Sequence, residues 1–316
     1  MSKPEARLPR FTRRTEAIAT MQLTARDLEI LRQVAVHRFL RSTHITDLLG
    51  GSPQQTRRRL QLLYHHGYLE RPRCQIDYYH QGGSQSMVYS LASRGAGTLR
   101  RMLDMPFEKM GWHKEQKKVG RIFLEHALLI SDVMVTLEIS CRDQPNLRLL
   151  TLDDFPKVNK QNRGDHTLRW QVRLPTNERI GVIPDAAFGI EQIDEQGQKS
   201  TTYYFLEADR GTMPIVRDGL AQTSFRRKLL AYAATWKQGI HKRELGLSRF
   251  RVLTVTKSAE RCRHLEDVAR EIDGGKSLFL FTTQQQFQPD ACLPLLQTFP
   301  QPSSVKNGPK YDRIAA

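Results

Sequence analysis

The sequence predicts a mixed α/β protein built as two domains, and two observations support this prediction. Residues 24–103 contain short helical segments and a hairpin pattern, whereas residues 119–282 form one long helix, several strands and then helices and strands in alternation. The second pattern implies a mixed sheet with helices on both faces. The chain has 316 residues, which accommodates two domains of about 150 residues each.

The chain is strongly basic, with a formal net charge of +16 and a sequence pI of about 9.9. There are 21 Lys and Arg against 10 Asp and Glu through Lys118, and 28 against 23 beyond it. The excess charge therefore lies mostly in the N-terminal third, which indicates a polyanionic partner such as DNA.

The sequence excludes a membrane-spanning protein, and its cysteine spacing argues against a disulfide-rich or zinc-binding one. No run is long and apolar enough to span a bilayer, and the N-terminus lacks the apolar core of a signal sequence, so no membrane association is expected. The four cysteines lie far apart, at Cys74, Cys141, Cys262 and Cys292. This spacing indicates reduced thiols in a cytoplasmic protein rather than a disulfide framework or a zinc site.

Three short helices are predicted near the N-terminus. Thr24 caps the first, which carries apolar residues at helical spacing, and the second covers Ser42–Leu49. The third begins at Ser52-Pro53, a cap followed by proline at the first helical position, and stops at Gly67. Three short helices with polar and basic residues at the start of the last one indicate a helix-turn-helix.

A hairpin pattern follows the third helix directly. The segments 68–71 and 87–91 have strand composition and flank a polar turn around Gly82-Gly83-Ser84. With a closing helix at Arg94–Leu103, residues 23–104 are predicted to form a winged helix-turn-helix domain that binds double-stranded DNA.

The candidate DNA contacts combine base-reading amides with phosphate-binding cations. They are Gln54, Gln55, Thr56, Arg57, Arg58, Arg59, Arg71 and Arg73. The alternative is a winged helix that makes only protein contacts.

The remaining chain divides into four parts. Residues 1–22 form a basic arm, which we expect to be flexible, and residues 105–118 form a polar linker. The second domain covers 119–299, and the Pro-, Ser- and Gly-containing tail at 300–316 is expected to be disordered. The predicted elements of the second domain are a helix at 119–139, strands at 147–152, 167–174, 179–190 and 202–208, a helix at 217–238, a strand at 250–256, a helix at 258–272 and a strand at 277–282.

Acidic residues interrupt two of the apolar strands. Asp185 follows Pro184, and Glu207 and Asp209 share one face of the next strand because alternate strand residues point the same way. Buried carboxylates are costly unless they are paired or hold a metal. If the two strands pair, three carboxylates converge, and such oxygen ligands suit Mg²⁺ or Mn²⁺. The alternative is that these acids are solvated or paired with Arg210.

Two polar residues near the start of the long helix admit a simpler interpretation. His126 lies beside the apolar stripe of that helix, where a packed core histidine is expected more often than a ligand. Glu125 is expected to be solvated rather than catalytic.

The ordered set of motifs resembles a known family. It consists of the winged helix, the Leu124-Glu125-His126-Ala127-Leu128 segment, Ile183-Pro184-Asp185-Ala186, the segment 205–212, and the helix bearing Lys228-Leu229-Leu230-Ala231-Tyr232. The second domain resembles the PD-(D/E)XK nuclease fold. From residue 24 to about 285, the chain resembles the replication-relaxation family, the MOB-C type of plasmid relaxase.

The resemblance implies a bacterial cytoplasmic enzyme that nicks DNA at the transfer origin of a plasmid or integrative element. It implies metal-dependent chemistry for conjugation or mobilisation, together with other relaxosome or coupling proteins. Asp185 and Glu207 would be metal ligands, and Asp209 a third ligand where the nuclease pattern has lysine. Lys228 is the candidate substitute for that lysine, with the alternative that it snorkels from the edge of an apolar face.

A second functional hypothesis stays open. The missing strand lysine favours a non-catalytic DNA-binding regulator of replication or transcription whose nuclease-like domain is inactive. The commoner tyrosine relaxases use a His-apolar-His metal motif, which this sequence lacks.

Overall fold

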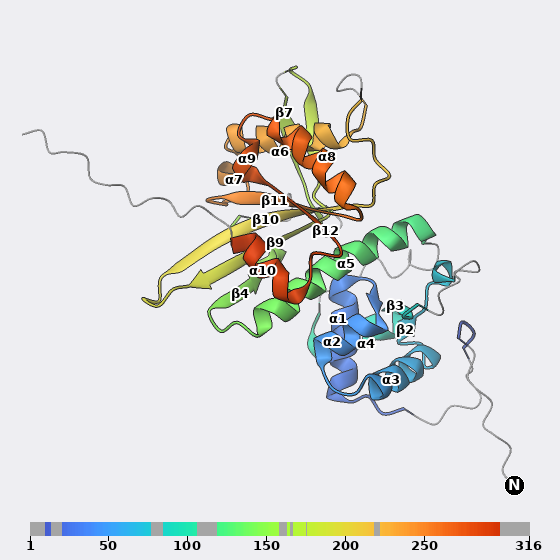
Figure 1. The fold of residues 1–316 in the computed structure, drawn as a ribbon. Coiled ribbons are helices and arrows are strands. Elements are labelled where there is room, and N and C mark those ends of the chain that lie inside the picture. The colour runs from blue at the N-terminus through green and yellow to red at the C-terminus, as the bar shows by residue number, and fades with distance from the viewer. Residues whose placement is uncertain are drawn as a thin grey trace, which may run out of the picture.

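The structure is a computed structural model that describes residues 10–13, 21–76, 85–105, 119–157, 163–164, 167–174, 176–217 and 222–297. Within these residues the chain is a mixed α/β protein whose two units meet along one long helix (Figure 1). The predicted wing turn at 82–84, nearly all of the predicted linker, the predicted C-terminal tail and most of the N-terminal arm lie outside the described residues.

The first unit has its helices and strands in the predicted order. They are α1 (Ala25–His37), β1 (Leu40–Arg41), α2 (Ser42–Leu49), α3 (Pro53–His65), β2 (Leu69–Glu70), the 3₁₀ helix η1 (Arg73–Gln75), β3 (Val88–Leu91) and α4 (Ser93–Leu103). The strands form an antiparallel sheet in the order β1-β3-β2. The Thr24 and Ser52 hydroxyls cap α1 and α3 by accepting hydrogen bonds from backbone N–H groups, as their sequence positions predicted.

The second unit is organised around a five-stranded mixed sheet in the order β12-β11-β10-β9-β4. Strand β10 pairs with β11 in parallel and with β9 in antiparallel fashion, so it lies at the centre. The strands are β4 (Leu147–Leu150), β9 (Ala186–Ile193), β10 (Lys199–Asp209), β11 (Phe250–Thr256) and β12 (Phe279–Thr283).

Helices cover both faces of this sheet, as the element order predicted. Phe205 and Tyr203 of β10 face a core that includes α6 (Phe225–Lys237) and α8 (Ala259–Arg270). Tyr204, Leu206 and Ala208 face a core formed with α5 (Arg121–Arg142) and α10 (Pro289–Gln297). Two short helices complete the unit, α7 (Ile240–Arg243) and α9 (Gly275–Leu278).

Two predicted strands were wrong in extent. The predicted strand at 179–190 is broken into β8 (Arg179–Val182) and β9, which belong to different sheets. Pro184 lies at the break, where its missing N–H cannot support a continuous ladder. The predicted strand at 167–174 is likewise split, and its second part, β7 (Trp170–Arg173), pairs with β8 as a separate hairpin.

The β7–β8 hairpin packs against α6 and shares its core with β10. Trp170 donates a hydrogen bond from Nε1 to Thr235 Oγ1 over 2.8 Å, and its ring packs against Phe205 and Tyr232. Helix α6 begins at Phe225 rather than at the predicted residue 217, because Ser224 supplies the N-cap. Helix α10 was not predicted.

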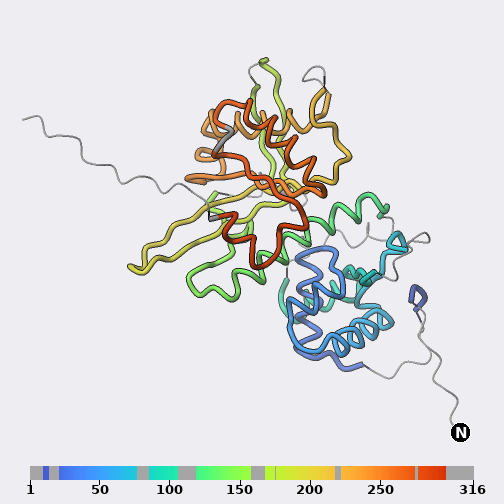
Figure 2. The backbone as a smooth tube through the Cα atoms, in the orientation of Figure 1, coloured from blue at the N-terminus to red at the C-terminus, as the bar shows by residue number. Residues whose placement is uncertain are grey.

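Helix α5 is shared by the two units (Figure 2). Its residues Leu124, Ala127 and Leu128 pack with Phe39 and Val88 of the first unit. Further along α5, Val135 joins the main core of the first unit, whereas Leu129, Val133 and Leu137 pack on the sheet. Among the described helices, including the 22-residue α5, none combines the length and apolarity that a membrane span requires.

One carboxylate ties the junction together. Asp132 of α5 forms an ion pair with Arg41 and contacts His44, whose Nε2 lies 2.8 Å from Oδ1. Gln284, which follows β12, donates to the other oxygen over 2.6 Å. The side chain of Asp132 is only 15% exposed, so these contacts are shielded from solvent.

Replacing Asp132 with alanine should destabilise the protein by about 2 kcal/mol, because Arg41 and His44 would lose their common partner in a partly buried junction. Urea unfolding measures this loss. The matched control is Asp267→Ala, which removes an exposed α8 ion pair with Arg270 and should cost less than about 0.5 kcal/mol. Equal losses in the two variants would contradict the assignment of Asp132 as the junction's anchor.

Candidate functional site

The candidate site lies where β10 ends, and Glu207 is its most buried acid, at 2% exposed. Lys228 Nζ lies 2.5 Å from Glu207 Oε2, and the Tyr232 hydroxyl donates to Oε1 over 2.6 Å. Lys228 and Tyr232 are four residues apart on α6 and therefore project from the same helix face. The ammonium group of Lys228 is bound at the acid, and the lysine side chain is 32% exposed.

Asp185 lies beside this pair, immediately before β9. Its backbone N–H donates to Leu206 O over 3.0 Å, and its Oδ2 accepts the N–H of Ala208 over 2.8 Å. Its Oδ1 lies 3.2 Å from His126 Nε2 of α5. The interruption between β8 and β9 at Pro184 thus places the Asp185 carboxylate against the backbone of β10, next to Glu207.

The three charged groups at this site shift one another's pKa. Burial raises the pKa of Glu207 to about 7, with a further rise from the negative charge of Asp185 and partial relief from Lys228. Burial opposes the charge on Lys228, but the carboxylates of Glu207 and Asp185 outweigh it and raise the lysine pKa. The result is one ammonium group held between two carboxylates.

Asp185 itself remains ionised. Burial would raise its pKa, but the hydrogen bond with His126, the charges of Lys228 and His126, and the N–H of Ala208 together lower it. Asp185 and Glu207 therefore differ in their protonation at neutral pH. Asp185 is a stable anion, whereas Glu207 exchanges its proton near neutral pH.

Asp209 does not join Asp185 and Glu207 in a three-carboxylate site. Its side chain is 3% exposed and forms a two-point ion pair with Arg261 of α8, with Arg261 Nη2 3.0 Å from Oδ1. Thr256 Oγ1 donates to Oδ2 over 3.0 Å, and the N–H of Gly211 donates to Oδ1 over 3.2 Å. The described residues contain no group of three or more His, Cys, Asp or Glu side chains placed to hold a metal ion.

The acceptor positions of Asp209 are therefore filled by protein donors, which is why it is not a free ligand. The alternative of solvated acids also fails, because Glu207 and Asp209 are both buried. Arg210 pairs with neither: its Nη1 lies 3.4 Å from Glu125 Oε2.

Of the two polar residues near the start of α5, His126 contacts an acid of the site, whereas Glu125 keeps a 39% exposed side chain. His126 bonds Asp185 rather than packing inertly, and Glu125 lies between Arg121, at 3.0 Å, and Arg210. The signal for both was a Glu-His pair interrupting an apolar helical stripe. Arg261 was not found, because nothing local in the sequence couples α8 to β10.

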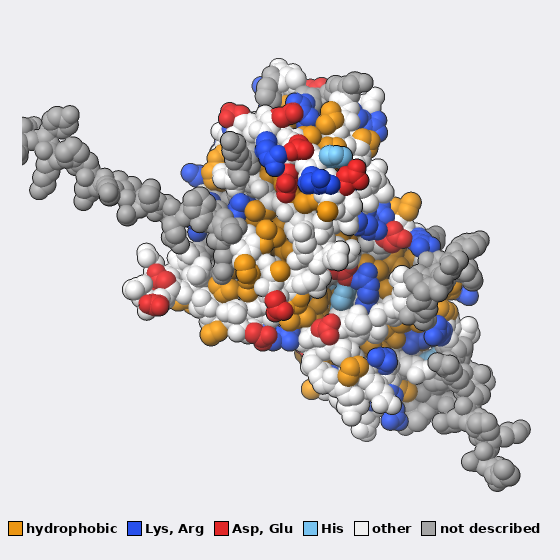
Figure 3. All heavy atoms as spheres, viewed as in Figure 1, with side chains coloured by type: hydrophobic (Ala, Val, Ile, Leu, Met, Phe, Trp, Pro, Cys, Tyr) orange, Lys and Arg blue, Asp and Glu red, His pale blue; other side chains and the backbone are white. Residues whose placement is uncertain are grey.

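The predicted DNA contacts of the first unit fall into two groups. Gln54, Gln55, Arg57 and Arg58 are exposed on α3, and Arg73 is exposed on η1, so these five stay candidates. Lys and Arg side chains gather where the two units meet, on the right of the view in Figure 3.

Three other predicted contacts are buried or paired within the first unit. Thr56 is fully buried at the α3 packing surface. Arg59 forms a two-point ion pair with Asp27 of α1, with Nε 2.9 Å from Oδ1. Arg71 is 8% exposed and its guanidinium stacks over the rings of Tyr64 and Tyr89.

A family model described as replication-relaxation matches residues 31–249, which is more than half of the chain. The chain belongs to the replication-relaxation family. The matched region of this replication-relaxation protein begins inside α1 and ends just before β11, so it includes α3, Asp185, Glu207 and Lys228. Comparisons with curated proteins and with solved structures gave no significant match.

Replacing Arg59 with alanine should lower the free energy of unfolding by about 2 kcal/mol, because Asp27 is fully buried and would lose its charge partner. Arg58→Ala, one residue earlier and exposed, is the matched control and should leave stability within about 0.5 kcal/mol. Thermal or urea unfolding distinguishes the two. An unchanged midpoint for Arg59→Ala would show that its contact with Asp27 is not structural.

The raised pKa of Glu207 predicts a pH-dependent loss of stability. Between the ordinary value of 4.5 and about 7 the folded protein keeps a proton that the unfolded chain has released, so stability falls as pH rises through this range. Relative to Glu207→Gln, which has no such titration, the wild type should lose about 3 kcal/mol across the range. Parallel stability curves for the two proteins would contradict the raised pKa.

Proposed function

We propose that the protein is a DNA nickase that acts at the transfer origin of a plasmid or integrative element, together with other relaxosome or coupling proteins. The single observation that supports this proposal is the grouping of Asp185, Glu207 and Lys228 at the end of β10. Two acids and a lysine at a sheet end are the groups that metal-dependent phosphodiester hydrolysis requires. Family membership independently supports a function on DNA.

The donor set fits one divalent cation, Mg²⁺ or Mn²⁺. Mg²⁺ is usually held through one or two carboxylates plus substrate phosphates, rather than by an all-protein cage. Asp185 and Glu207 supply two carboxylates close enough for the charge of one to raise the pKa of the other. When bound, the cation would polarise the scissile phosphate and activate water.

Lys228 is the proposed charge stabiliser. The nuclease pattern has a lysine where this chain has Asp209, and the α6 lysine brings an ammonium group to Glu207 from a different element. Because Asp185 and Glu207 keep it protonated, it can interact with negative charge developing on a phosphate oxygen.

Two further residues position the acids. His126 holds the Asp185 carboxylate from α5, and Tyr232 holds Glu207 Oε1 with its hydroxyl. These contacts fix both carboxylates before substrate arrives, which is the preorganisation that electrostatic catalysis needs.

DNA recognition is proposed for the first unit, interpreted as a winged helix-turn-helix. The exposed Gln54, Gln55, Arg57 and Arg58 begin α3, the helix that enters the major groove in such domains. This unit would bind the duplex while the acids carry out the cleavage.

One observation favours a second function, a non-catalytic DNA-binding regulator of replication or transcription. Asp209, where the nuclease pattern has lysine, is committed to Arg261. If wild-type protein binds its origin DNA tightly but does not nick it with Mg²⁺ or Mn²⁺, the nickase proposal fails and the regulator function takes its place.

Asp185→Asn and Glu207→Gln should each abolish nicking of supercoiled origin plasmid while leaving duplex affinity nearly unchanged, and chelation with EDTA should have the same effect. Lys228→Ala should slow nicking by roughly two to three orders of magnitude. The control is Lys237→Ala, on the same helix but in an exposed pair with Asp273. Agarose-gel conversion of supercoiled to open-circular plasmid is the measurement, and full activity in Asp185→Asn would refute the assignment.

Arg57→Ala combined with Arg58→Ala should weaken duplex binding at every sequence and reduce the slope of log affinity against log salt by about 2, because two phosphate contacts are lost. Gln54→Ala should instead reduce the preference for the specific DNA sequence over other sequences, with little change in that slope. Titration of labelled duplex at several salt concentrations separates these effects. An unaltered slope in the double variant would exclude the start of α3 as the phosphate contact.

A further inference from the structure

Residues 10–13, a short piece of the basic N-terminal segment, are fastened to the first unit. We call these four residues the strap. Arg13 donates from Nε to the carbonyl oxygen of Tyr64 and from Nη2 to that of Leu69, each over 2.9 Å. Its Nη2 also lies 2.8 Å from Oε1 of Glu70. Arg13 therefore joins the strap both to the last turn of α3 and to β2.

The end of α3 attracts a cation, which explains the place of Arg13. The last carbonyl groups of a helix have no partner within the helix and carry the negative end of its dipole. The guanidinium of Arg13 also lies 5.2 Å from the centre of the Tyr64 ring, a distance at which cation–π attraction acts. Hydrogen bonds, an ion pair and a ring contact therefore hold this end of the strap together.

Arg71 fastens the other end of the strap. Its Nη1 donates to the carbonyl oxygen of Arg10 over 2.6 Å, and its Nη2 donates to the Tyr89 hydroxyl over 3.0 Å. Its guanidinium lies 4.2 Å from the centre of the Tyr64 ring, so this ring contacts Arg71 as well as Arg13. The hydrogen bond from Arg71 uses the backbone of Arg10 rather than its side chain.

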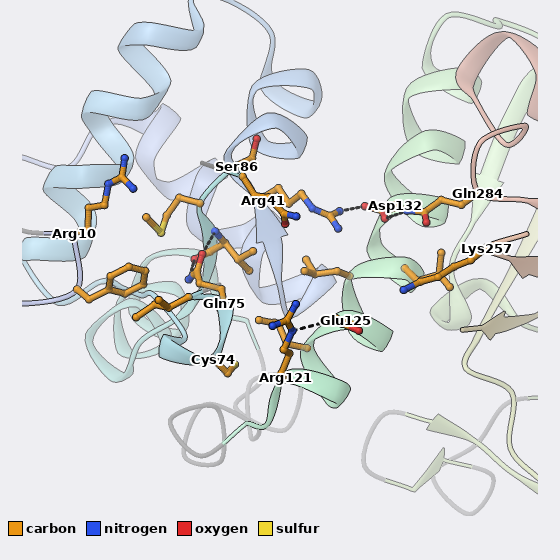
Figure 4. A pocket seen from close by; sticks show the side chains of 18 residues that line it. Arg10, Arg41, Cys74, Gln75, Ser86, Arg121, Glu125, Asp132, Lys257 and Gln284 are labelled. Carbon is orange, nitrogen blue, oxygen red and sulfur yellow. Dashed lines mark hydrogen bonds and ion pairs between the residues drawn. The ribbon is translucent and has the colours of Figure 1, made fainter. Parts of the chain in front are cut away.

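Arg10 is exposed and lines a hollow of about 610 Å³ beside α3. Arg57 and Gln61 line the same hollow from α3, and Thr43 lines it from α2. Arg10 also lines a neighbouring hollow, where it lies at the edge remote from Lys257 of the second unit (Figure 4). The strap thus brings an arginine from outside the helix-turn-helix to the side of α3.

The lining of the hollow beside α3 is mostly cationic. Among the described residues that form it, Arg10, Arg57 and Arg71 carry guanidinium groups and Asp47 carries a carboxylate. Arg71 is 8% exposed and is bound to protein acceptors, so Arg10 and Arg57 are the exposed cations of this lining. Like charges gathered on one surface favour an anionic ligand.

The position beside α3 indicates that this anion is a phosphate of duplex DNA. The major groove is about 12 Å wide, so a recognition helix lying in it has a sugar-phosphate backbone on either side. The hollow borders the face of α3 that bears Arg57 and Gln61. The backbone on that side of the groove would therefore lie within reach of both Arg57 and Arg10.

We propose that the strap is part of the DNA-binding surface of the first unit and that Arg10 binds a phosphate of the duplex next to α3. Arg13 and Arg71 are positioning residues, which hold the strap through protein contacts. The inference rests on the proposed function, in which α3 binds duplex DNA, and adds a contact that carries no sequence information of its own.

Titration of labelled duplex at several salt concentrations tests this contact. Arg10→Ala should reduce the slope of log affinity against log salt by about 1 and weaken binding about fivefold near physiological salt, for origin and unrelated duplexes alike. Arg10→Lys should keep the slope, because a phosphate contact needs the charge. The control Arg101→Ala removes an exposed charge from α4 and should change affinity less than about twofold. An unchanged slope in Arg10→Ala, or equal changes in Arg10→Ala and Arg101→Ala, would overturn the proposal.

Trypsin provides a second measurement, because it recognises the arginine side chain that the phosphate would bind. Duplex DNA should slow cleavage between Arg10 and Phe11, measured by mass spectrometry of the released N-terminal peptide. In Arg13→Ala, which loosens the strap, the free protein should be cleaved faster and the duplex should protect less. Equal cleavage with and without duplex would overturn the proposal. Tighter duplex binding by Arg13→Ala would also overturn it, because the strap would then cover the DNA site rather than belong to it.

These outcomes separate the strap from the proposed function. A reduced salt slope in Arg57→Ala combined with Arg58→Ala, together with an unchanged slope in Arg10→Ala, would refute the strap and leave α3 as the DNA contact. A reduced slope in Arg10→Ala, with origin plasmid left intact by the wild type, would support the strap and refute the nickase.

Discussion

The buried ion pair between Glu207 and Lys228 is the interaction on which the second unit depends. A carboxyl group at 2% exposure is costly to ionise, which is why the pKa of Glu207 rises to about 7 even with a cation and a hydroxyl bound to it. Lys228 and Tyr232 provide both from one face of α6. The Ser224 cap, which sets where α6 begins, and the β7–β8 hairpin behind Tyr232 hold that face against β10.

Helix α5 extends the same arrangement to the first unit. It contributes His126 to Asp185 and, six residues later, Asp132 to the junction with Arg41 and His44. A single rigid element therefore positions one acid of the site and anchors the unit proposed to bind DNA. The placement of the two units relative to each other depends on the packing of this helix.

Local signals in the sequence predicted much of the fold. The Thr24 and Ser52 caps defined the first and third helices, and the element order gave a mixed sheet with helices on both faces. The position of Lys228 four residues before Tyr232 gave contact with the acids as one of two alternatives, and the structure places its Nζ at Glu207. These features succeed because caps and helical periodicity act over a few residues.

The contacts that local signals did not predict join distant segments. Asp209 was predicted as a metal ligand, but Arg261, 52 residues later, fills its acceptor positions. Arg59 was predicted to bind phosphate, but Asp27, 32 residues earlier, holds it. In both cases the residue type fits either role, and only the packing of one element on another decides between them. His126 was missed for the same reason. Its partner Asp185 lies in the interruption between β8 and β9, far from His126 in the sequence.

Binding of Mn²⁺ in the presence of origin DNA, followed by electron paramagnetic resonance, tests the central claim most directly. The account predicts that wild type and Asp209→Asn both bind the ion, and that Asp185→Asn and Glu207→Gln do not. Loss of binding in Asp209→Asn with retention in Asp185→Asn, or no binding by wild type, would contradict the assignment of Asp185, Glu207 and Lys228 as the reaction centre.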